Sequence, residues 1–302
     1  MGKIAFIFSG QGDQFPGMGK ELYEKYDEAA RVFELCDAIR SDTSRQCFCG
    51  TQQELSETKN TQPCMYALEL AAAQVLIGHG INPDAVAGFS LGEVAAATVA
   101  GLFDIKTGFS LVCRRGELMQ RDAEKVETSM AAVLKLSENQ IRDICEGFEG
   151  VYPVNFNCPG QITISGKSEH MPEVFAAVKS VGGRAIPLKV KGGFHSPFMR
   201  EASRDFAAEL ENAKISDMEI ALYSNLTSQI YGNNIIETLA KQICSPVYWE
   251  KTVRNMIESG IDTFIEIGPG RTLTNMMAKI DNSVKVYCIS DIDAVLSEVG
   301  NA

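Results

Sequence analysis

The nine residues from Ala85 to Glu93 constrain the fold of this chain more than any other stretch. They read as a short apolar strand that ends in Gly88-Phe89-Ser90-Leu91-Gly92, a G-x-S-x-G pattern, and the small residues of 94–101 then suit a tightly packed helix. Glycines two residues on either side of a serine let neighbouring chain pass close to a sharp, strained turn. The pattern predicts a nucleophilic serine at the carboxyl edge of a sheet, beside the free N–H groups of a helix start. An ordinary glycine-rich turn is the alternative.

Composition narrows the class of protein. The chain has 302 residues, 45% hydrophobic and 22% charged, which is typical of a soluble globular protein with one large domain or two unequal ones. No apolar run is long enough to cross a bilayer. The net charge of −11 argues against nucleic acid as a partner. Nine cysteines without a C-x-x-C pair indicate a reduced, cytoplasmic protein rather than a disulfide framework or a metal site.

The order of predicted elements indicates an α/β fold with an insertion. We expect one helix over 22–39, irregular chain over 41–59, and a helix that ends near 78–80. From residue 130 to 190 the predicted order is β-α-β-β-α-β, which is that of a ferredoxin-like split unit. We therefore expect a ferredoxin-like small subdomain over 125–192. Residues 1–124 and 193–302 would form a large α/β catalytic subdomain, with an α/β-hydrolase-like core and a parallel sheet.

A nucleophilic serine needs a base, and the chain has three histidines. His79 is expected at a helix C-terminus, and His170 precedes a helix start and should be exposed. His195 lies in Gly192-Gly193-Phe194-His195-Ser196-Pro197, where the chain returns from the insertion, and junctions of this kind often bind ligands. Elimination favours His195 as the general base for Ser90. A hinge histidine without a catalytic part is the alternative.

Seven motifs occur together in one order, and together they carry a resemblance. They are Gly10-Gln11-Gly12-Asp13-Gln14, Gly88 to Glu93, Arg115-Gly116, Asn157-Cys158-Pro159-Gly160-Gln161, Gly193 to Pro197, Gln242 with Pro246-Val247-Tyr248-Trp249, and Glu266 to Gly270. With these motifs the chain resembles malonyl-CoA:acyl carrier protein transacylases over nearly its whole length. It is also similar to the acyltransferase domains of polyketide and fatty acid synthases.

The resemblance implies a role for each candidate residue. Ser90 would be the nucleophile and His195 the base, oriented by the backbone carbonyl of Gln242 rather than by a carboxylate. The backbone N–H groups of Gln11 and Leu91 would form the oxyanion hole. Arg115 would hold the free malonyl carboxylate, because its planar fork suits that group; a solvated arginine in a surface ion pair is the alternative. The other implied substrate-binding residues are Met119, Phe194 and Asn157.

Two phenylalanines, Phe89 and Phe194, directly precede the expected nucleophile and the expected base. The family usually has a histidine just before the nucleophile, where this chain has Phe89. Phe194, beside His195, resembles the malonyl-selecting form of related acyltransferases, in which a bulky ring leaves no room for an α-methyl group.

The implied activity is transfer of malonyl from malonyl-CoA to the phosphopantetheine thiol of acyl carrier protein. It would follow a ping-pong route through malonyl-Ser90, in fatty acid or polyketide biosynthesis. The coenzyme A thioester would be a substrate, with no separate cofactor, and we expect a monomer without a nucleic-acid or membrane partner. A serine thioesterase or lipase-type hydrolase, a non-catalytic carrier-protein docking module, and the transacylase of a malonate decarboxylase system are the alternatives.

Overall fold

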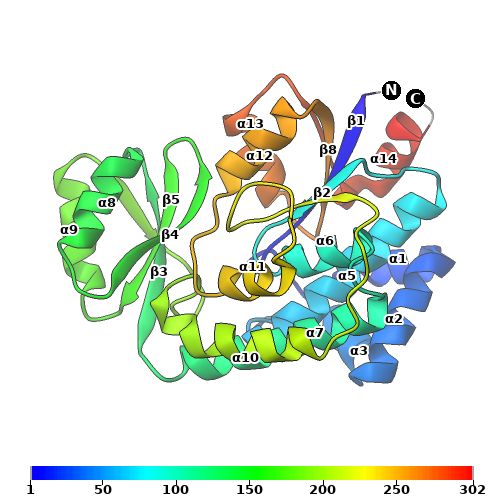
Figure 1. Cartoon of the computed structure of the whole chain (residues 1–302), viewed down its shortest axis with the longest axis horizontal. Helices are drawn as coiled ribbons and strands as arrows, with labels where there is room; N and C mark the ends of the chain where they lie inside the picture. The colour runs from blue at the N-terminus through cyan, green and yellow to red at the C-terminus, as the bar shows by residue number, and fades with distance from the viewer. Residues whose placement is uncertain (1, 301–302) are drawn as a thin grey trace.

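The larger of two sheets forms the centre of the molecule. The computed structural model describes residues 2–300, and Figure 1 shows this sheet to the right of a smaller one. Its strands are all parallel and lie in the order β7-β2-β1-β8-β9. Their bounds are Lys3–Phe8 for β1, Ala85–Gly88 for β2, Ala221–Tyr223 for β7, Ile261–Ile267 for β8 and Lys285–Cys288 for β9. Because neighbouring strands run in one direction, the chain segments after β1 and β2 meet at the same edge.

Helices cover both faces of this sheet, which explains why its strands are nearly all apolar. Phe6, Phe8 and Val86 belong to the core beneath α2 (Asp27–Ile39), α5 (Thr58–Gly78), α6 (Gly92–Val99) and α7 (Ile105–Ala123). The alternate residues Ile7 and Ala87 face the second core, which contains residues of α12 (Trp249–Glu258) and α13 (Thr272–Ile280).

The smaller sheet is antiparallel, in the order β4-β5-β3-β6. Its elements are β3 (Thr128–Leu134), α8 (Glu138–Glu146), β4 (Val151–Cys158), β5 (Gln161–Lys167), α9 (Met171–Ser180) and β6 (Arg184–Pro187). Ile162 and Ile164 of β5 pack with residues of α8 and α9 in a separate core. The opposite face, which carries Thr163, lines a cavity that it shares with the larger sheet.

The expected single helix over 22–39 is wrong. The structure has α1 (Lys20–Lys25) and α2, separated by Tyr26 in extended backbone. A tertiary contact accounts for the break, since the Tyr26 hydroxyl donates to Asp293, 2.9 Å away, near the start of α14 (Ile292–Val299). The expected irregular chain over 41–59 is also wrong, because it contains α3 (Thr43–Cys49), α4 (Gln52–Leu55) and the start of α5. The remaining helices are η1 (Pro197–Met199), α10 (Arg200–Glu211), α11 (Ile235–Gln242) and η2 (Ile289–Asp291).

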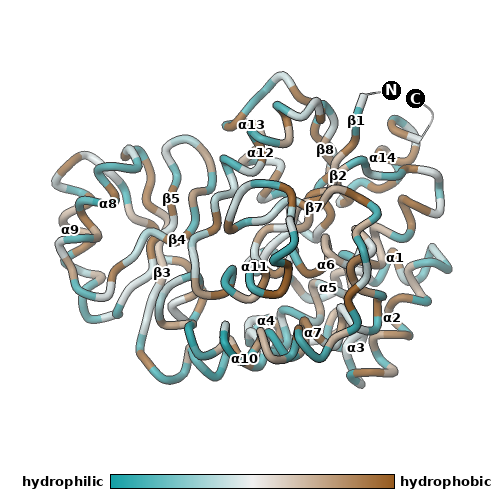
Figure 2. The backbone as a smooth tube through the Cα atoms, viewed as in Figure 1, coloured by the Kyte–Doolittle hydropathy of each residue, from teal (hydrophilic) through white to brown (hydrophobic). Residues whose placement is uncertain are grey.

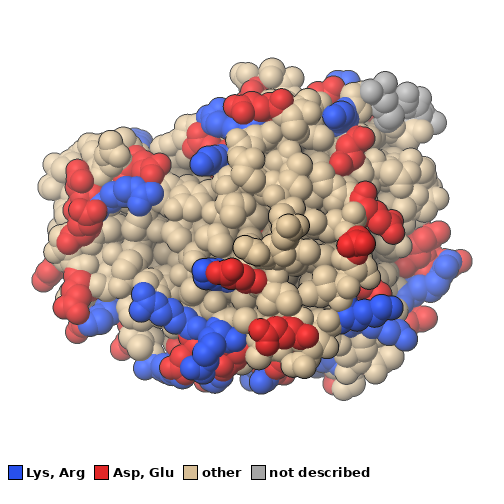
Figure 3. Space-filling model, viewed as in Figure 1, with Lys and Arg blue, Asp and Glu red and all other residues tan. Residues whose placement is uncertain are grey.

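Hydrophobic and charged residues lie in different parts of the molecule. In Figure 2 hydrophobic residues follow the central strands, and α10 at the lower edge is mainly hydrophilic. Figure 3 shows basic and acidic side chains intermixed along that edge, with few charges at the centre of the drawn face. All nine cysteines are free thiols. Within residues 2–300, no helix has the length and apolar character needed to span a membrane.

Candidate active site

Ser90 stands at the turn between β2 and α6, at the edge of the sheet where the β1 loop also lies. Its φ of 55° places it in the left-handed region, which is rare for a residue with a side chain. The flanking glycines permit this turn: a Cβ on Gly88 would lie 1.9 Å from Gly92 C, and one on Gly92 would lie 2.5 Å from Phe8 O. The turn therefore has the close backbone packing that the G-x-S-x-G pattern predicts.

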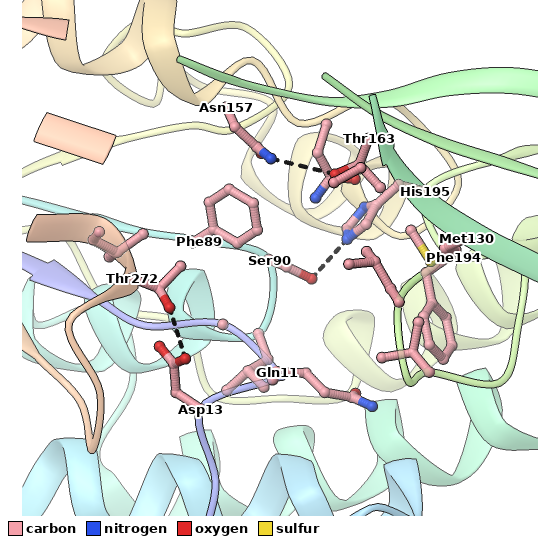
Figure 4. A pocket seen from close by; sticks show the side chains of 18 of the residues that line it. Gln11, Asp13, Phe89, Ser90, Met130, Asn157, Thr163, Phe194, His195 and Thr272 are labelled. Carbon is pink, nitrogen blue, oxygen red and sulfur yellow. Dashed lines mark hydrogen bonds between the residues drawn. The ribbon is translucent and has the colours of Figure 1, made fainter. Parts of the chain in front are cut away.

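The His195 side chain faces Ser90 (Figure 4), and its other ring nitrogen faces the backbone of Gln242. Its Nε2 is 2.7 Å from Ser90 Oγ, and its Nδ1 is 2.9 Å from the backbone carbonyl oxygen of Gln242. The carbonyl can only accept, so Nδ1 carries the proton and Nε2 is left to accept one from Ser90. Burial, and secondly the charge of Arg115, lowers the pKa of His195 to about 4. The imidazole is therefore neutral at pH 7, as a general base must be.

The other two histidines lie in structural settings. His79 follows the last residue of α5, and its Nδ1 is 2.8 Å from the Val75 carbonyl oxygen. His170 directly precedes α9, is partly exposed and lies 3.8 Å from a carboxylate oxygen of Glu169. Neither lines the cavity next to Ser90.

Arg115 projects from α7 to the nucleophile, and the alternative of a solvated surface arginine is wrong. The side chain is fully buried, with Nη2 3.4 Å from Ser90 Oγ. Nη1 donates to Gln62 Oε1 and Nη2 to Gln242 Oε1, each at 2.8 Å, and Nε has no acceptor among the described residues. Burial lowers the pKa of Arg115 to about 10, and the nearby carboxyl of Glu93 opposes that shift. The guanidinium thus remains charged at neutral pH in a site with little water.

A cavity of about 260 Å³ opens in front of Ser90 and His195. Its lining includes five more of the residues that the sequence singles out: Gln11, Leu91, Met119, Asn157 and Phe194. Arg115 and Gln242 are fully buried and do not line it. Met119 lies one turn after Arg115 on α7, and Phe194 directly precedes the histidine. The hydrogen bonds within the described residues include none from the backbone N–H of Gln11 or Leu91, so both groups remain free to donate to a ligand.

Phe89 fills the position before the nucleophile with an aromatic ring. The ring contacts Trp249 edge to face, with centroids 5.6 Å apart, and lines the cavity. It gives this wall an apolar surface.

A buried polar network behind Ser90 was not predicted from the sequence. Asn225 Oδ1 accepts from the Ser90 N–H at 2.8 Å, and Asn225 Nδ2 donates to the Gly88 carbonyl at 2.6 Å. Gln242 Nε2 donates to the Ser90 carbonyl at 2.7 Å and to Glu93 Oε2 at 2.8 Å. Tyr231 donates to the other oxygen of Glu93. Burial raises the pKa of Glu93 to about 7, against the effect of these hydrogen bonds.

One signal for this network was available in the sequence. Asn225 lies just beyond the carboxyl end of β7, and polar residues at the carboxyl ends of parallel strands face the site edge. Glu93 belongs to the serine motif itself. Gln62 and Tyr231 carried no comparable signal, because α5 and the loop after β7 reach the site only through tertiary packing. Among residues 2–300, no group of three or more His, Cys, Asp or Glu side chains could hold a metal ion.

Known proteins are similar to this chain in sequence and in fold over most of its length. Residues 5–290 match the acyl transferase domain family. A malonyl CoA-acyl carrier protein transacylase of Bacillus subtilis is 37% identical over 98% of this chain and 96% of its own length. The crystal structure of one from Clostridium perfringens is 34% identical, covers 99% of this chain and 98% of its own, and superposes with a TM-score of 0.95. A malonyl-transacylase solved in complex with its type II PKS acyl-carrier protein has a TM-score of 0.95 at 31% identity, over 99% of this chain and 100% of its own. The chain belongs to the acyl transferase family, within its group of malonyl CoA-acyl carrier protein transacylases.

Proposed function

We propose that this protein transfers the malonyl group of malonyl-CoA to the phosphopantetheine thiol of acyl carrier protein, through a malonyl-Ser90 intermediate. The observation that carries the proposal is the buried Arg115 guanidinium, 3.4 Å from the Ser90 hydroxyl. A charge held there favours an acyl group that ends in a carboxylate, and a simple acyl chain would leave that charge unpaired. The relatives named for malonyl transfer support the same substrate.

In the first half-reaction, Ser90 Oγ attacks the thioester carbon while His195 Nε2 takes the hydroxyl proton. The carbonyl oxygen becomes negative and is stabilised by the N–H groups of Gln11 and Leu91, a contribution of roughly 3–4 kcal/mol per donor. When the tetrahedral intermediate collapses, the C–S bond breaks and His195 returns the proton to the leaving coenzyme A thiolate. Arg115 holds the malonyl carboxylate throughout.

The second half-reaction reverses these roles with a new nucleophile. The carrier-protein thiol gives its proton to His195 and attacks the ester carbon of malonyl-Ser90. Ser90 Oγ then leaves and regains a proton from His195. The Gln242 carbonyl keeps the imidazole in one tautomer through both halves, although it adds no negative charge to stabilise imidazolium.

The hydrolase alternative is not favoured. A serine thioesterase or lipase commonly orients its histidine with a carboxylate, whereas His195 Nδ1 faces a backbone carbonyl. A non-catalytic docking module has no need of a paired serine and histidine. The transacylase of a malonate decarboxylase system would use the same chemistry, and carrier-protein relatives argue for the fatty acid or polyketide route.

We further propose a division of the chain into two units. The large unit, 1–124 and 193–302, would have an α/β-hydrolase-like core. The small unit, 125–192, would be ferredoxin-like, which its β3-α8-β4-β5-α9-β6 sequence supports. We expect a cytoplasmic monomer whose coenzyme A thioester is a substrate and which uses no separate cofactor.

Intact-protein mass spectrometry after treatment with malonyl-CoA alone tests the proposal. The protein should gain one malonyl mass and stall, with the modification on the Ser90 peptide, and Ser90→Ala should gain nothing. Addition of phosphopantetheinylated carrier protein should then move the mass to the carrier. Steady release of free malonate without a carrier protein would identify a hydrolase, and a modified Ser90→Ala protein would rule out the nucleophile.

A further inference from the structure

Glu93, a buried carboxyl group behind Ser90, has no part in the two proposed half-reactions. It lies in the first turn of α6, and its side chain is fully buried. Its Oε2 accepts from Gln242 Nε2 at 2.8 Å, and its Oε1 accepts from the Tyr231 hydroxyl. The backbone nitrogen of Asn225 lies 3.3 Å from both oxygens. These contacts all bring donors to Glu93, so its carboxyl group acts as an acceptor in this site.

The Gln242 side chain joins Glu93 to Arg115. Its Nε2 donates to Glu93 Oε2 at 2.8 Å and to the Ser90 carbonyl at 2.7 Å, while its Oε1 accepts from Arg115 Nη2 at 2.8 Å. A reversed amide would turn its oxygen toward two acceptors and its NH₂ group toward the donors of a guanidinium, so this network favours one orientation. Glu93 and the Ser90 carbonyl together therefore hold Gln242 Oε1 against Arg115.

The Arg115 nitrogen that Gln242 holds is also the one next to the nucleophile. Arg115 Nη2 lies 3.4 Å from Ser90 Oγ, and the other terminal nitrogen donates to Gln62. Without Gln242 Oε1, Nη2 would lose its 2.8 Å acceptor and the guanidinium would be fixed at one nitrogen instead of two. A misplacement of about 1 Å in a positioning group can cost roughly 10²-fold in rate. The placement of the guanidinium beside Ser90 therefore depends on the Gln242 amide.

Gln242 has two separable functions in the proposed reaction. Its backbone carbonyl holds the His195 ring, which serves every acyl donor. Its side-chain amide holds Arg115, which serves only a donor with a free carboxylate. A change at Glu93 that acts through this amide should therefore alter the choice of donor, whereas a general loss of order in the fold should slow all donors alike.

We propose that Glu93 is a positioning residue for malonyl selection: it accepts a hydrogen bond from Gln242 and so keeps the Gln242 amide oxygen on Arg115. This inference rests on the proposed function, in which Arg115 holds the malonyl carboxylate. A neutral carboxyl group keeps a carbonyl oxygen that can accept, so the role does not need a charge on Glu93. Glu93→Gln should therefore preserve it, because the glutamine amide oxygen can accept at the same place.

Acylation of Ser90 by malonyl-CoA and by acetyl-CoA tests this role. Glu93→Met fills a similar volume without a strong acceptor. We expect it to lower the malonyl-over-acetyl ratio of kcat/KM about tenfold, as for loss of one buried hydrogen bond. Glu93→Gln should keep most of the wild-type ratio. In an Arg115→Ala background, Glu93→Met should lower the ratio no further, because the side chain through which Glu93 acts is gone.

Glu69→Met is the matched control. Glu69 is also a fully buried glutamate, on α5, and its carboxyl oxygens have no hydrogen-bond partner among the described residues. The substitution removes a buried carboxyl group without removing a partner of Gln242, so the wild-type ratio should remain. Glu93→Ala provides a second variant should the Glu93→Met protein not fold, and the same fall in the ratio is expected.

The outcomes separate this inference from the proposed function. An unchanged ratio in a folded Glu93→Met protein, an equal fall in Glu69→Met or in Glu93→Gln, or a further fall in the Arg115→Ala background overturns the positioning role and leaves malonyl transfer intact. A wild-type protein that malonyl-CoA does not acylate at Ser90 overturns the proposed function, and this inference with it.

Discussion

Replacing Arg115 should change which acyl group the protein accepts, beyond slowing it. The side chain is fully buried, and burial lowers its pKa to about 10, so the charged form is costly without a counter-charge. A malonyl carboxylate would supply a counter-charge, whereas acetyl-CoA would leave the guanidinium without one. Removing one member of a buried ion pair costs about 3–5 kcal/mol. We therefore expect Arg115→Ala to lower the ratio of kcat/KM for malonyl-CoA over acetyl-CoA by roughly 10²–10⁴-fold.

The assay is acylation of Ser90 by each donor, followed by intact mass in single turnover. Arg114→Ala is the matched control, because Arg114 is the neighbouring residue, its side chain is 47% exposed, and it pairs with Glu117 and Glu209 on the surface. The control should keep the wild-type ratio. The thermal unfolding of both variants should also be measured, because Arg115→Ala leaves Gln62 Oε1 without its donor and can lower the stability of the fold. A folded Arg115→Ala protein with an unchanged ratio refutes the anchor assignment.

Four further predictions concern His195 and the segment that leads to it. His195→Ala should slow acylation by roughly 10²–10⁴-fold, and a larger loss in His79→Ala or His170→Ala would contradict the assignment. Because the pKa of His195 is lowered from 6.5 to about 4, kcat/KM for acylation should stay constant as pH falls through 6.5 and decline only near pH 4. A decline of kcat/KM that begins at pH 6.5 or above would argue against a buried neutral base. The same lowered pKa means that the folded state binds fewer protons than the unfolded chain, so this group contributes stability above pH 6.5 that is lost as pH falls toward 4, measurable by denaturant titration. The exposed Lys189 and Lys191 lie shortly before His195 and could attract an acidic carrier protein, so charge reversal there should weaken the carrier-protein half-reaction more at low salt than at high salt. Equal kinetics at both salt concentrations would show that these lysines do not contact the carrier protein.

The local motifs were predictable because their chemistry depends on the backbone nearby. The G-x-S-x-G turn needs small residues at fixed offsets, and the structure shows how little space Gly88 and Gly92 have. The sequence also predicted the strand before Ser90, the helix end at His79 and the helix start after His170, because each has its own turn or cap signal. The β-α-β-β-α-β order of the small unit followed from such signals and matches the observed elements.

Structural features that depend on contacts between distant residues could not be predicted from the sequence. Tyr26 interrupts the first helical stretch through a bond to a residue more than 260 positions away, which no periodicity reveals. The burial of Arg115 was also hidden: α7 is amphipathic, and Arg114 and Arg115 are alike until the packing of α5 on α7 decides which one faces the nucleophile. The Glu93–Asn225–Gln242 network joins three separate segments behind Ser90, so its members had no common local pattern.

Both reacting side chains project from backbone that disfavours them. Ser90 has a φ of 55° and His195 a φ of 60°, and residues held in this region cost of order 1–3 kcal/mol each. Glycine at position 90 would remove that cost, because it adopts such angles freely, and would also remove the nucleophile. Selection for thermal stability alone would thus favour sequences in which the chemistry is lost. A search for a more thermostable variant should therefore exclude positions 90 and 195 and seek stabilising substitutions elsewhere in the fold.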